Sequence, residues 1–490
     1  MPATYSLTLR SELDRKLTIP EMDGNFLYLE SISGGGSGSQ ASATGASGSF
    51  QINSGGEFSG FGILNSDSLY LNGSTVSVGA SYSTFIGIGS GIVNQGIANT
   101  FIGTFAGQAN TTGITNTFIG AVSGAQNTIG NGNIFIGIEA GASNTTGNKN
   151  IFIGGSTGVC ADSSCNIFIG AGSAGTKTNG DCNIFIGVGS GEDNVQGDCN
   201  VFIGHRSGCQ SYLGGGNTYI GISSGVSTTG CNNTFIGAYS GECSNGGCNT
   251  FIGTLAGNNS SGCGNTLIGE QSGHYTNSNF NTFVGRTSGF SNTTGNANTF
   301  IGTGAGLYSV GSENGTFVGT WAGFQSVSGY SNTFIGNNAG YNTTGSYNTF
   351  IGQCSGCSNV SGSNNAFIGQ ASGFHMTDGC FNTFLGQNSG YRTCVGHCNT
   401  FIGSNAGYYN EYGCNNISIG IFSGPSASSI CNTISIGDLA QVASTGDFAI
   451  GSSFHPITTS ATSSIVDSPE SFMKIILNGI TYYLPLHQTI

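Results

Sequence analysis

Residues 332–340 read Asn-Thr-Phe-Ile-Gly-Asn-Asn-Ala-Gly, and close versions of this stretch recur along most of the chain. We number each repeat from its aromatic position, position 0, which is Phe334 in this copy. Twenty-two copies, from Phe85 to Ser435, follow one another in steps of 16 or 17 residues. A fixed period of this kind indicates a solenoid, in which each repeat forms one coil stacked on its neighbours.

The residue types within the repeat indicate the kind of coil. The Thr-Phe-Ile core is β-branched and aromatic and lies between Asn and Gly, which is typical of a short strand between turns. Gly follows at +2 in every copy and again at +6 in all but the copies at Phe168 and Ser435. Glycine at fixed corners suits a positive φ or a close approach of stacked backbones. We therefore predict an all-β fold, a parallel β-solenoid of about 22 coils with repeats of 16–17 residues.

The direction of the side chains predicts how the solenoid assembles. Positions −1 and +1 share one face of the strand and position 0 lies on the other. Position +1 is aliphatic in every copy, which favours this face as the coil interior and turns position 0 outward. Because an exposed aromatic column is costly, we expect further copies of the chain to cover it. We predict a homotrimer whose inter-chain seam consists of Phe101, Phe118, Phe135, Phe152, Phe168, Phe185, Phe202, Phe235, Phe251, Phe300, Phe334, Phe367 and Phe401.

The opposite orientation, with the aromatic column inside each coil and Thr and Ile outside, stays open as an alternative. The loss of the aromatic residue at Ser418 and Ser435, while Ile remains at +1, favours a seam that opens near one end. Position −2 is Asn in 19 copies. Stacked Asn side chains can bond one another and a corner backbone, so we predict a structural ladder there.

Composition excludes several classes of protein. Only 6% of the residues are charged and the formal net charge is −13, which argues against nucleic acid and anionic lipid as partners. No apolar run approaches the ~20 residues of a membrane helix, so we expect no membrane insertion. The first 18 residues lack the apolar core of a signal peptide. We expect a virion or extracellular surface structure without a classical signal peptide.

The strand-turn pattern Asn-Thr-Phe-Ile-Gly-x-x-Ser resembles the head repeat of the YadA-type trimeric autotransporter adhesins, which reads approximately Asn-Ser-Val-Ala-Ile-Gly-x-x-Ser. Residues 75–79, 434–437 and 448–451 come closer still. The resemblance covers about residues 74–451 and implies a β-roll assembled as a trimer. In that family the repeat is shorter, position 0 is usually Ala, and the members carry signal peptides and membrane anchors.

The ends of the chain differ from the repeats. Residues 1–30 are charge-rich, and residues 17–30 resemble an N-terminal segment of phage and large-virus tail-fibre proteins. We expect a short helical head there that attaches to a virion or baseplate protein; a simple N-terminal cap is the alternative. Residues 31–49 predict a flexible Gly/Ser-rich linker, and residues 50–83 a β lead-in to the solenoid.

The solenoid repeats are expected over residues 84–451, and a C-terminal β cap or tip over residues 452–490. Residues 472–486 predict a hairpin with a type I′ turn at Asn478-Gly479. This part also resembles the C-terminal ends of phage and marine-virus fibre proteins. It either caps the last coil and registers the trimer, or forms a tip that binds a host-surface glycan or protein.

Sixteen cysteines leave three interpretations open: reduced thiols at coil corners, disulfides within coils, or metal ligands. Ten of them lie at −3 or −4 and therefore at one corner of their coils. Cys354-Ser-Gly-Cys357 is a lone C-x-x-C without a matching second pair, so we expect no metal site. The candidate disulfide pairs are Cys160 with Cys165, Cys243 with Cys248, and Cys394 with Cys398.

The carboxylates are scattered, and the six histidines share no position of the repeat, so neither indicates a catalytic site. We therefore expect no enzyme and no cofactor. A glycan-cleaving site of the phage depolymerase type stays a minor alternative. The leading hypothesis is a structural fibre of a virion or phage tail, a trimeric rod that projects a distal tip for host adhesion. A self-assembling extracellular filament or surface adhesin is the alternative. An ice-binding solenoid comes third, on account of the Thr column at −1.

Overall fold

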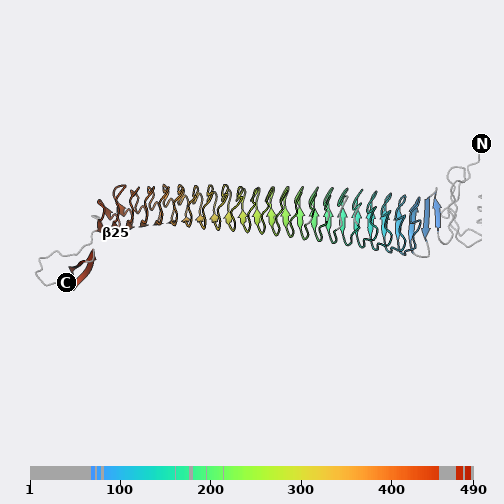
Figure 1. Ribbon diagram of the computed structural model, residues 1–490, viewed down its shortest axis with the longest axis horizontal. Coiled ribbons are helices and arrows are strands. Elements are labelled where there is room, and N and C mark those ends of the chain that lie inside the picture. Colours follow the sequence, from blue (N-terminus) through green and yellow to red (C-terminus); the bar gives the residue numbers. More distant parts are fainter. Residues whose placement is uncertain are drawn as a thin grey trace, which may run out of the picture. The chain divides into compact units, whose positions relative to one another are not determined.

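The computed structural model describes residues 68–71, 74–78, 82–159, 162–175, 180–194, 196–212, 214–451, 471–477 and 480–486. Among these residues every helix or strand element is a β-strand. They fall into two compact units, Met1–Asn166 and Ile167–Ile490. Each unit contains a parallel β-solenoid, and the repeats make about 21 turns, close to the 22 coils predicted (Figure 1). The predicted solenoid is confirmed; the predicted head at 1–30 and linker at 31–49 lie outside the described residues.

The first unit begins with antiparallel strands and continues as parallel coils. Strand β1 pairs antiparallel with β2, and β2 pairs antiparallel with β3, which is the first strand of the repeat. From β3 onward each coil contributes one short strand that pairs parallel with the next. The strands are β1 (Ser68–Leu71), β2 (Ser74–Val78), β3 (Thr84–Gly87), β4 (Thr100–Ile102), β5 (Thr117–Ile119), β6 (Ile134–Ile136) and β7 (Ile151–Ile153).

The second unit repeats the same coil many times. Figure 1 shows its strands stacked side by side, one per coil. They are β8 (Ile167–Ile169), β9 (Ile184–Ile186), β10 (Val201–Ile203), β11 (Thr218–Ile220), β12 (Thr234–Ile236), β13 (Thr250–Ile252), β14 (Thr266–Ile268), β15 (Thr282–Val284), β16 (Thr299–Ile301), β17 (Thr316–Val318), β18 (Thr333–Ile335), β19 (Thr349–Ile351), β20 (Ala366–Ile368), β21 (Thr383–Leu385), β22 (Thr400–Ile402), β23 (Ile417–Ile419), β25 (Ile434–Ile436) and β27 (Phe448–Ile450).

Two further strand pairs lie near the C-terminal end of the second unit. Strand β24 (Gly424–Pro425) pairs parallel with β26 (Gln441–Val442). Strand β28 (Ser471–Leu477) pairs antiparallel with β29 (Ile480–Leu486), with Leu477 opposite Ile480. The predicted C-terminal hairpin is therefore confirmed, while its two turn residues lie outside the described residues.

The coils stack in register, so that each position lies over the same position of the next coil. In β12 and β13, for example, Thr234 pairs with Thr250, Phe235 with Phe251 and Ile236 with Ile252. The rings of Phe235 and Phe251 are 4.7 Å apart between centroids and 6° from parallel. This separation equals the spacing of neighbouring strands. An aromatic ring at position 0 therefore repeats at the distance at which flat rings stack.

The aromatic column lies inside the coils, which corrects the predicted seam. Every phenylalanine assigned to that seam is fully buried within this single chain: Phe101, Phe118, Phe135, Phe152, Phe168, Phe185, Phe202, Phe235, Phe251, Phe300, Phe334, Phe367 and Phe401. The residues at −1 and +1 are half-buried or exposed and face outward. The uniform aliphatic residue at +1 was thus misleading, because the ring is the side chain large enough to fill a coil of this size.

Two ladders of polar side chains complete the interior. At −2, Oδ1 of Asn99 accepts the backbone N–H of Asn116 in the next coil at 2.8 Å. Nδ2 of Asn116 in turn donates to the carbonyl of Gly130 at 2.8 Å. At +5, hydroxyls such as that of Ser389 donate to the position-0 carbonyl of the next coil, here Phe401, at 2.9 Å. The Asn ladder predicted from the repeat is therefore confirmed, and it satisfies buried backbone groups that the short strands leave unpaired.

The two glycines of the repeat have different tasks. At +2, a Cβ on Gly237 would lie 2.5 Å from the carbonyl oxygen of Gly253, so glycine allows the coils to stack. At +6, a Cβ on Gly141 would lie 2.6 Å from the edge of the Phe135 ring, and φ is +60°. The chain segment around +6 therefore closes the coil against the ring, on a side other than that of the strand.

We expect Gly141→Ala to destabilise the first unit by about 2–4 kcal/mol, because it adds overpacking against Phe135 to the strain of a left-handed residue. The matched control is Gly155→Ala, an exposed site where nothing lies within 4 Å of the added Cβ and φ is not positive. Thermal unfolding followed by circular dichroism measures both. Equal effects of the two substitutions would contradict this role for +6.

The last coils replace the aromatic residue with Ser418 and Ser435, both fully buried. Here the opposing segment forms strands β24 and β26 and lies closer, since a Cβ on Gly424 would be 2.7 Å from Oγ of Ser418. A thinner coil needs only a small side chain to fill it. The loss of Phe at these two positions therefore reflects a narrower interior, and does not mark the opening of a seam.

We expect Phe251→Ala to destabilise the second unit by about 3–5 kcal/mol, the usual cost of a cavity at a buried aromatic residue. Phe381→Ala is the control, since Phe381 is 63% exposed and its loss should change stability by less than about 0.5 kcal/mol. Denaturant unfolding and hydrogen exchange of the neighbouring coils measure the difference. If Phe251→Ala changed the oligomeric state but left stability intact, the ring would be a seam residue after all.

Candidate functional site

The outward face of the parallel sheet is the first candidate surface. It carries Thr, Ile, Val or Ala at −1 and Ile, Val or Leu at +1, with no charged residue at either position in any copy. Along β12 and β13, Ile236 and Ile252 are each 36% exposed. The same arrangement continues at Ile301 and Ile335, in β16 and β18. A face of this kind is a continuous mixed column of hydroxyls and aliphatic side chains.

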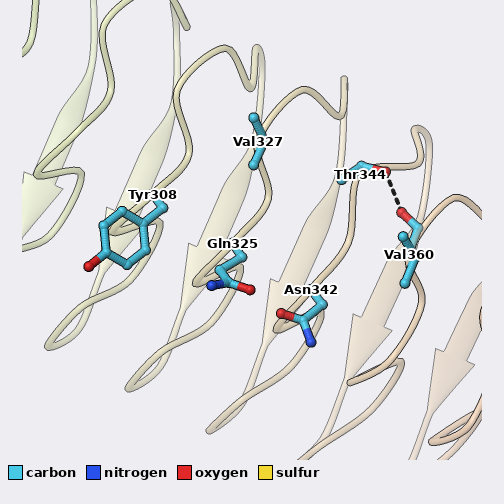
Figure 2. Close-up of a pocket in the computed structure, with 6 residues that line it drawn as sticks. All are labelled: Tyr308, Gln325, Val327, Asn342, Thr344 and Val360. Carbon is cyan, nitrogen blue, oxygen red and sulfur yellow. Dashed lines mark hydrogen bonds between the residues drawn. The ribbon is translucent and has the colours of Figure 1, made fainter.

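A shallow groove on another side of the second unit is the second candidate. It has a volume of about 410 Å³ and is lined by Tyr308, Gln325, Val327, Asn342, Thr344 and Val360 (Figure 2). These residues form two rows along successive coils, one at +8 and one at +10. Between the rows lie buried residues at +9, such as Ser326 and Thr343. The groove therefore runs from coil to coil, parallel to the direction in which the coils stack.

Polar atoms of the groove differ in how well they are satisfied. The Thr344 hydroxyl donates to the carbonyl of Val360 in the next coil (Figure 2). In contrast, Oδ1 of Asn342 is buried and has no hydrogen-bond partner, and neither has Oγ1 of Thr343 beneath it. Both oxygens are buried and therefore do not face the open groove; the half-buried Asn342 side chain meets the groove with its remaining atoms.

The cysteines give no disulfide in the candidate pairs that the structure describes. Cys243 and Cys248 are free thiols, as are Cys394 and Cys398; Cys165 is free and Cys160 lies outside the described residues. In the pair Cys394 and Cys398 the two backbones bond to different coils. The N–H of Cys394 bonds to the next coil at Glu411, whereas that of Cys398 bonds to the preceding coil at Cys380. The disulfide interpretation of Cys243 with Cys248 and of Cys394 with Cys398 is corrected to free thiols, whereas that of Cys160 with Cys165 stays a prediction.

Of the two thiols in the C-x-x-C pair, that of Cys357 is held in its protonated form. Burial, followed by the neighbouring Cys354 thiol, raises the pKa of Cys357 to about 11. The Cys357 thiol therefore stays protonated at neutral pH, and a thiol in this form is neither a good nucleophile nor a good metal ligand. Among the described residues, no group of three His, Cys, Asp or Glu side chains is placed to hold a metal ion.

Asp162 is a carboxylate of the first unit that accepts several backbone N–H groups. Its oxygens accept the N–H groups of Thr145, Thr146 and Gly147 at 3.1, 2.7 and 3.0 Å, and the Thr145 hydroxyl at 2.6 Å. Partial burial raises the pKa of Asp162, but the bonds from the Thr145 hydroxyl and the backbone amides lower it more, to below the ordinary 3.8. The side chain caps the turn of the preceding coil and is not arranged for acid–base chemistry.

We expect Asp162→Asn to destabilise the first unit at neutral pH by about 1 kcal/mol, because the neutral amide keeps one acceptor oxygen but loses the charge-assisted bonds of the carboxylate. Because the folded pKa is lowered, this stabilisation is present above the unfolded pKa and disappears as the pH falls through the folded pKa. The difference in thermal midpoint between wild type and variant should therefore shrink below about pH 4. An undiminished difference at pH 2.5 would contradict the assignment.

Comparison with known proteins finds no family model, no curated protein and no solved structure that matches the chain. Its resemblances to the adhesin head repeat and to tail-fibre proteins therefore stay predictions. No helix in the described part of the chain is long and apolar enough to span a membrane.

Proposed function

We propose that the chain forms the shaft of a fibre on a virion or phage tail, assembled from several copies of itself, most simply three. The observation that supports this is the outward sheet face, which is uncharged at −1 and +1 in all copies and half-exposed along its length. A contiguous exposed apolar face on a folded protein usually marks a site of interaction with another surface. A face without charged side chains is suited to a covering copy.

The energy available from such a contact grows with each coil. Completing the burial of one Ile that is 36–40% exposed is worth about 0.5–1 kcal/mol. In-register stacking places these side chains in one straight column within each unit, so a second column of the same spacing can lie against it. A closed ring of three copies about one axis would leave no such column uncovered.

The ends of the chain would complete the fibre. Under this proposal residues 1–30 attach to a virion or baseplate protein, and the hairpin β28–β29 belongs to the cap or host-binding tip. A self-assembling extracellular filament or surface adhesin uses the same shaft. Genes flanking this one would separate the two roles, since tail and capsid genes favour the virion fibre and anchoring genes favour the surface filament.

The assembly is tested by light scattering of the purified full chain, which has a mass of 49.5 kDa. We expect about three times this mass, and dissociation of the double variant Ile236→Lys with Ile252→Lys, because two buried charges would have to be desolvated. The control carries the same two lysines at Ile138 and Ile222, which are 63% and 53% exposed at the +3 corner.

If light scattering showed the wild-type chain to be a monodisperse monomer, this result would overturn the proposal of a shaft assembled from several copies. The Thr column at −1 would then favour the ice-binding alternative, because Phe at position 0 lies inside the coil and the Thr side chains face outward. Thermal hysteresis of the same monomer is the measurement that decides it.

A further inference from the structure

Position +7 distinguishes the coils after residue 266 from those before. Of the nine coils from Leu267 to Phe401, seven carry an aromatic ring at +7: His274, Phe290, Phe324, Tyr341, Phe374, Tyr391 and Tyr408. None of the eleven earlier coils does, and they have residues such as Gln108, Ala125 and Glu192 there. Since the earlier coils form the same fold, the aromatic row is not required for folding. The row indicates a surface of these coils with a role other than folding.

The rings at +7 and +8 are oriented differently. Rings at +7 stack on one another, as Phe324 and Tyr341 do at 4.8 Å and 10°. Rings at +8 lie nearly perpendicular to those at +7: the interplanar angle is 88° between Tyr308 and Phe324, and 83° between Tyr409 and Tyr408. The faces of the stacked +7 rings are therefore in contact with each other, whereas the Tyr308 side chain is 46% exposed to solvent. Figure 2 shows the ring of Tyr308 face-on beside the groove.

Two amide side chains follow Tyr308 in the same row. Gln325 and Asn342 occupy +8 in the next two coils and line the groove with it (Figure 2). They carry both donors and acceptors, although the buried Oδ1 of Asn342 does not face the groove. The row therefore offers one aromatic face and two amides at intervals of one coil.

This chemistry suits a neutral sugar chain. The face of a tyrosine packs against the apolar C–H face of a pyranose ring, and amides exchange hydrogen bonds with its hydroxyls. No charged residue lines the groove, and the net charge of −13 disfavours anionic ligands. The strand spacing that separates successive coils is close to the length of one hexose in an extended chain.

We infer that this groove binds an extended, neutral oligosaccharide, with one sugar over Tyr308 and the following ones against Gln325 and Asn342. The groove lies on the +8 to +10 segment and the outward sheet face on −1 and +1, so the two surfaces do not compete. Sugar binding is therefore independent of the shaft assembly, and each can fail without the other.

The test is calorimetric titration of the full chain with cellohexaose and chitohexaose, two neutral β-linked hexaoses. We expect Tyr308→Ala to weaken binding at least about tenfold, because it removes the stacking face. Asn342→Ala should weaken it about three- to tenfold through the loss of a hydrogen bond. Tyr347→Ala is the matched control: Tyr347 is 62% exposed at the −3 corner, away from the groove, and its loss should leave affinity unchanged.

Both groove residues are surface side chains, and unchanged thermal midpoints of the variants would exclude misfolding as the cause of a loss. Three results would overturn the inference. These are the absence of binding to either hexaose at millimolar concentration, equal losses in Tyr347→Ala and Tyr308→Ala, and binding restricted to an anionic glycan such as heparin.

Discussion

Stacking of one aromatic ring on the next, at the distance that separates hydrogen-bonded strands, is the interaction on which this structure depends. Backbone pairing fixes the spacing of the coils, and planar rings at position 0 fill the interior at that same spacing. The other recurrent positions of the repeat support this arrangement. Gly at +6 makes room beside the ring, Gly at +2 lets the backbones approach, and Asn at −2 bonds to both neighbouring coils.

The period of the repeat was sufficient to predict a parallel β-solenoid, because only stacked coils explain 22 copies at 16–17 residues. It was not sufficient to predict which face of the strand points inward. A strand of three residues offers a single alternation, and both Phe at 0 and Ile at +1 are uniform. Ser418 seemed to favour an aromatic seam, but its coil is narrower because β24 lies close to it. That narrowing depends on the path of the opposing segment, which the pattern of the repeat does not reveal.

The groove could have been found only in part. Aligning the repeats places His274, Phe290 and Phe324 at one position, so the aromatic row at +7 is visible in the sequence once the coils are superposed. The orientation of Tyr308 at right angles to that row, and the unsatisfied oxygen of Asn342, depend on side-chain geometry. That Cys394 and Cys398 are free thiols likewise could not be predicted from their spacing in the sequence.

The bonds described for Asn116 reach only the coil before it and the coil after it, and the same is true of the stacked rings. A coil inserted or deleted by recombination between two copies would therefore meet neighbours of the usual kind on both sides. The length of such a solenoid can therefore change in whole coils without a new kind of contact, and its stability changes by the share of the coils gained or lost.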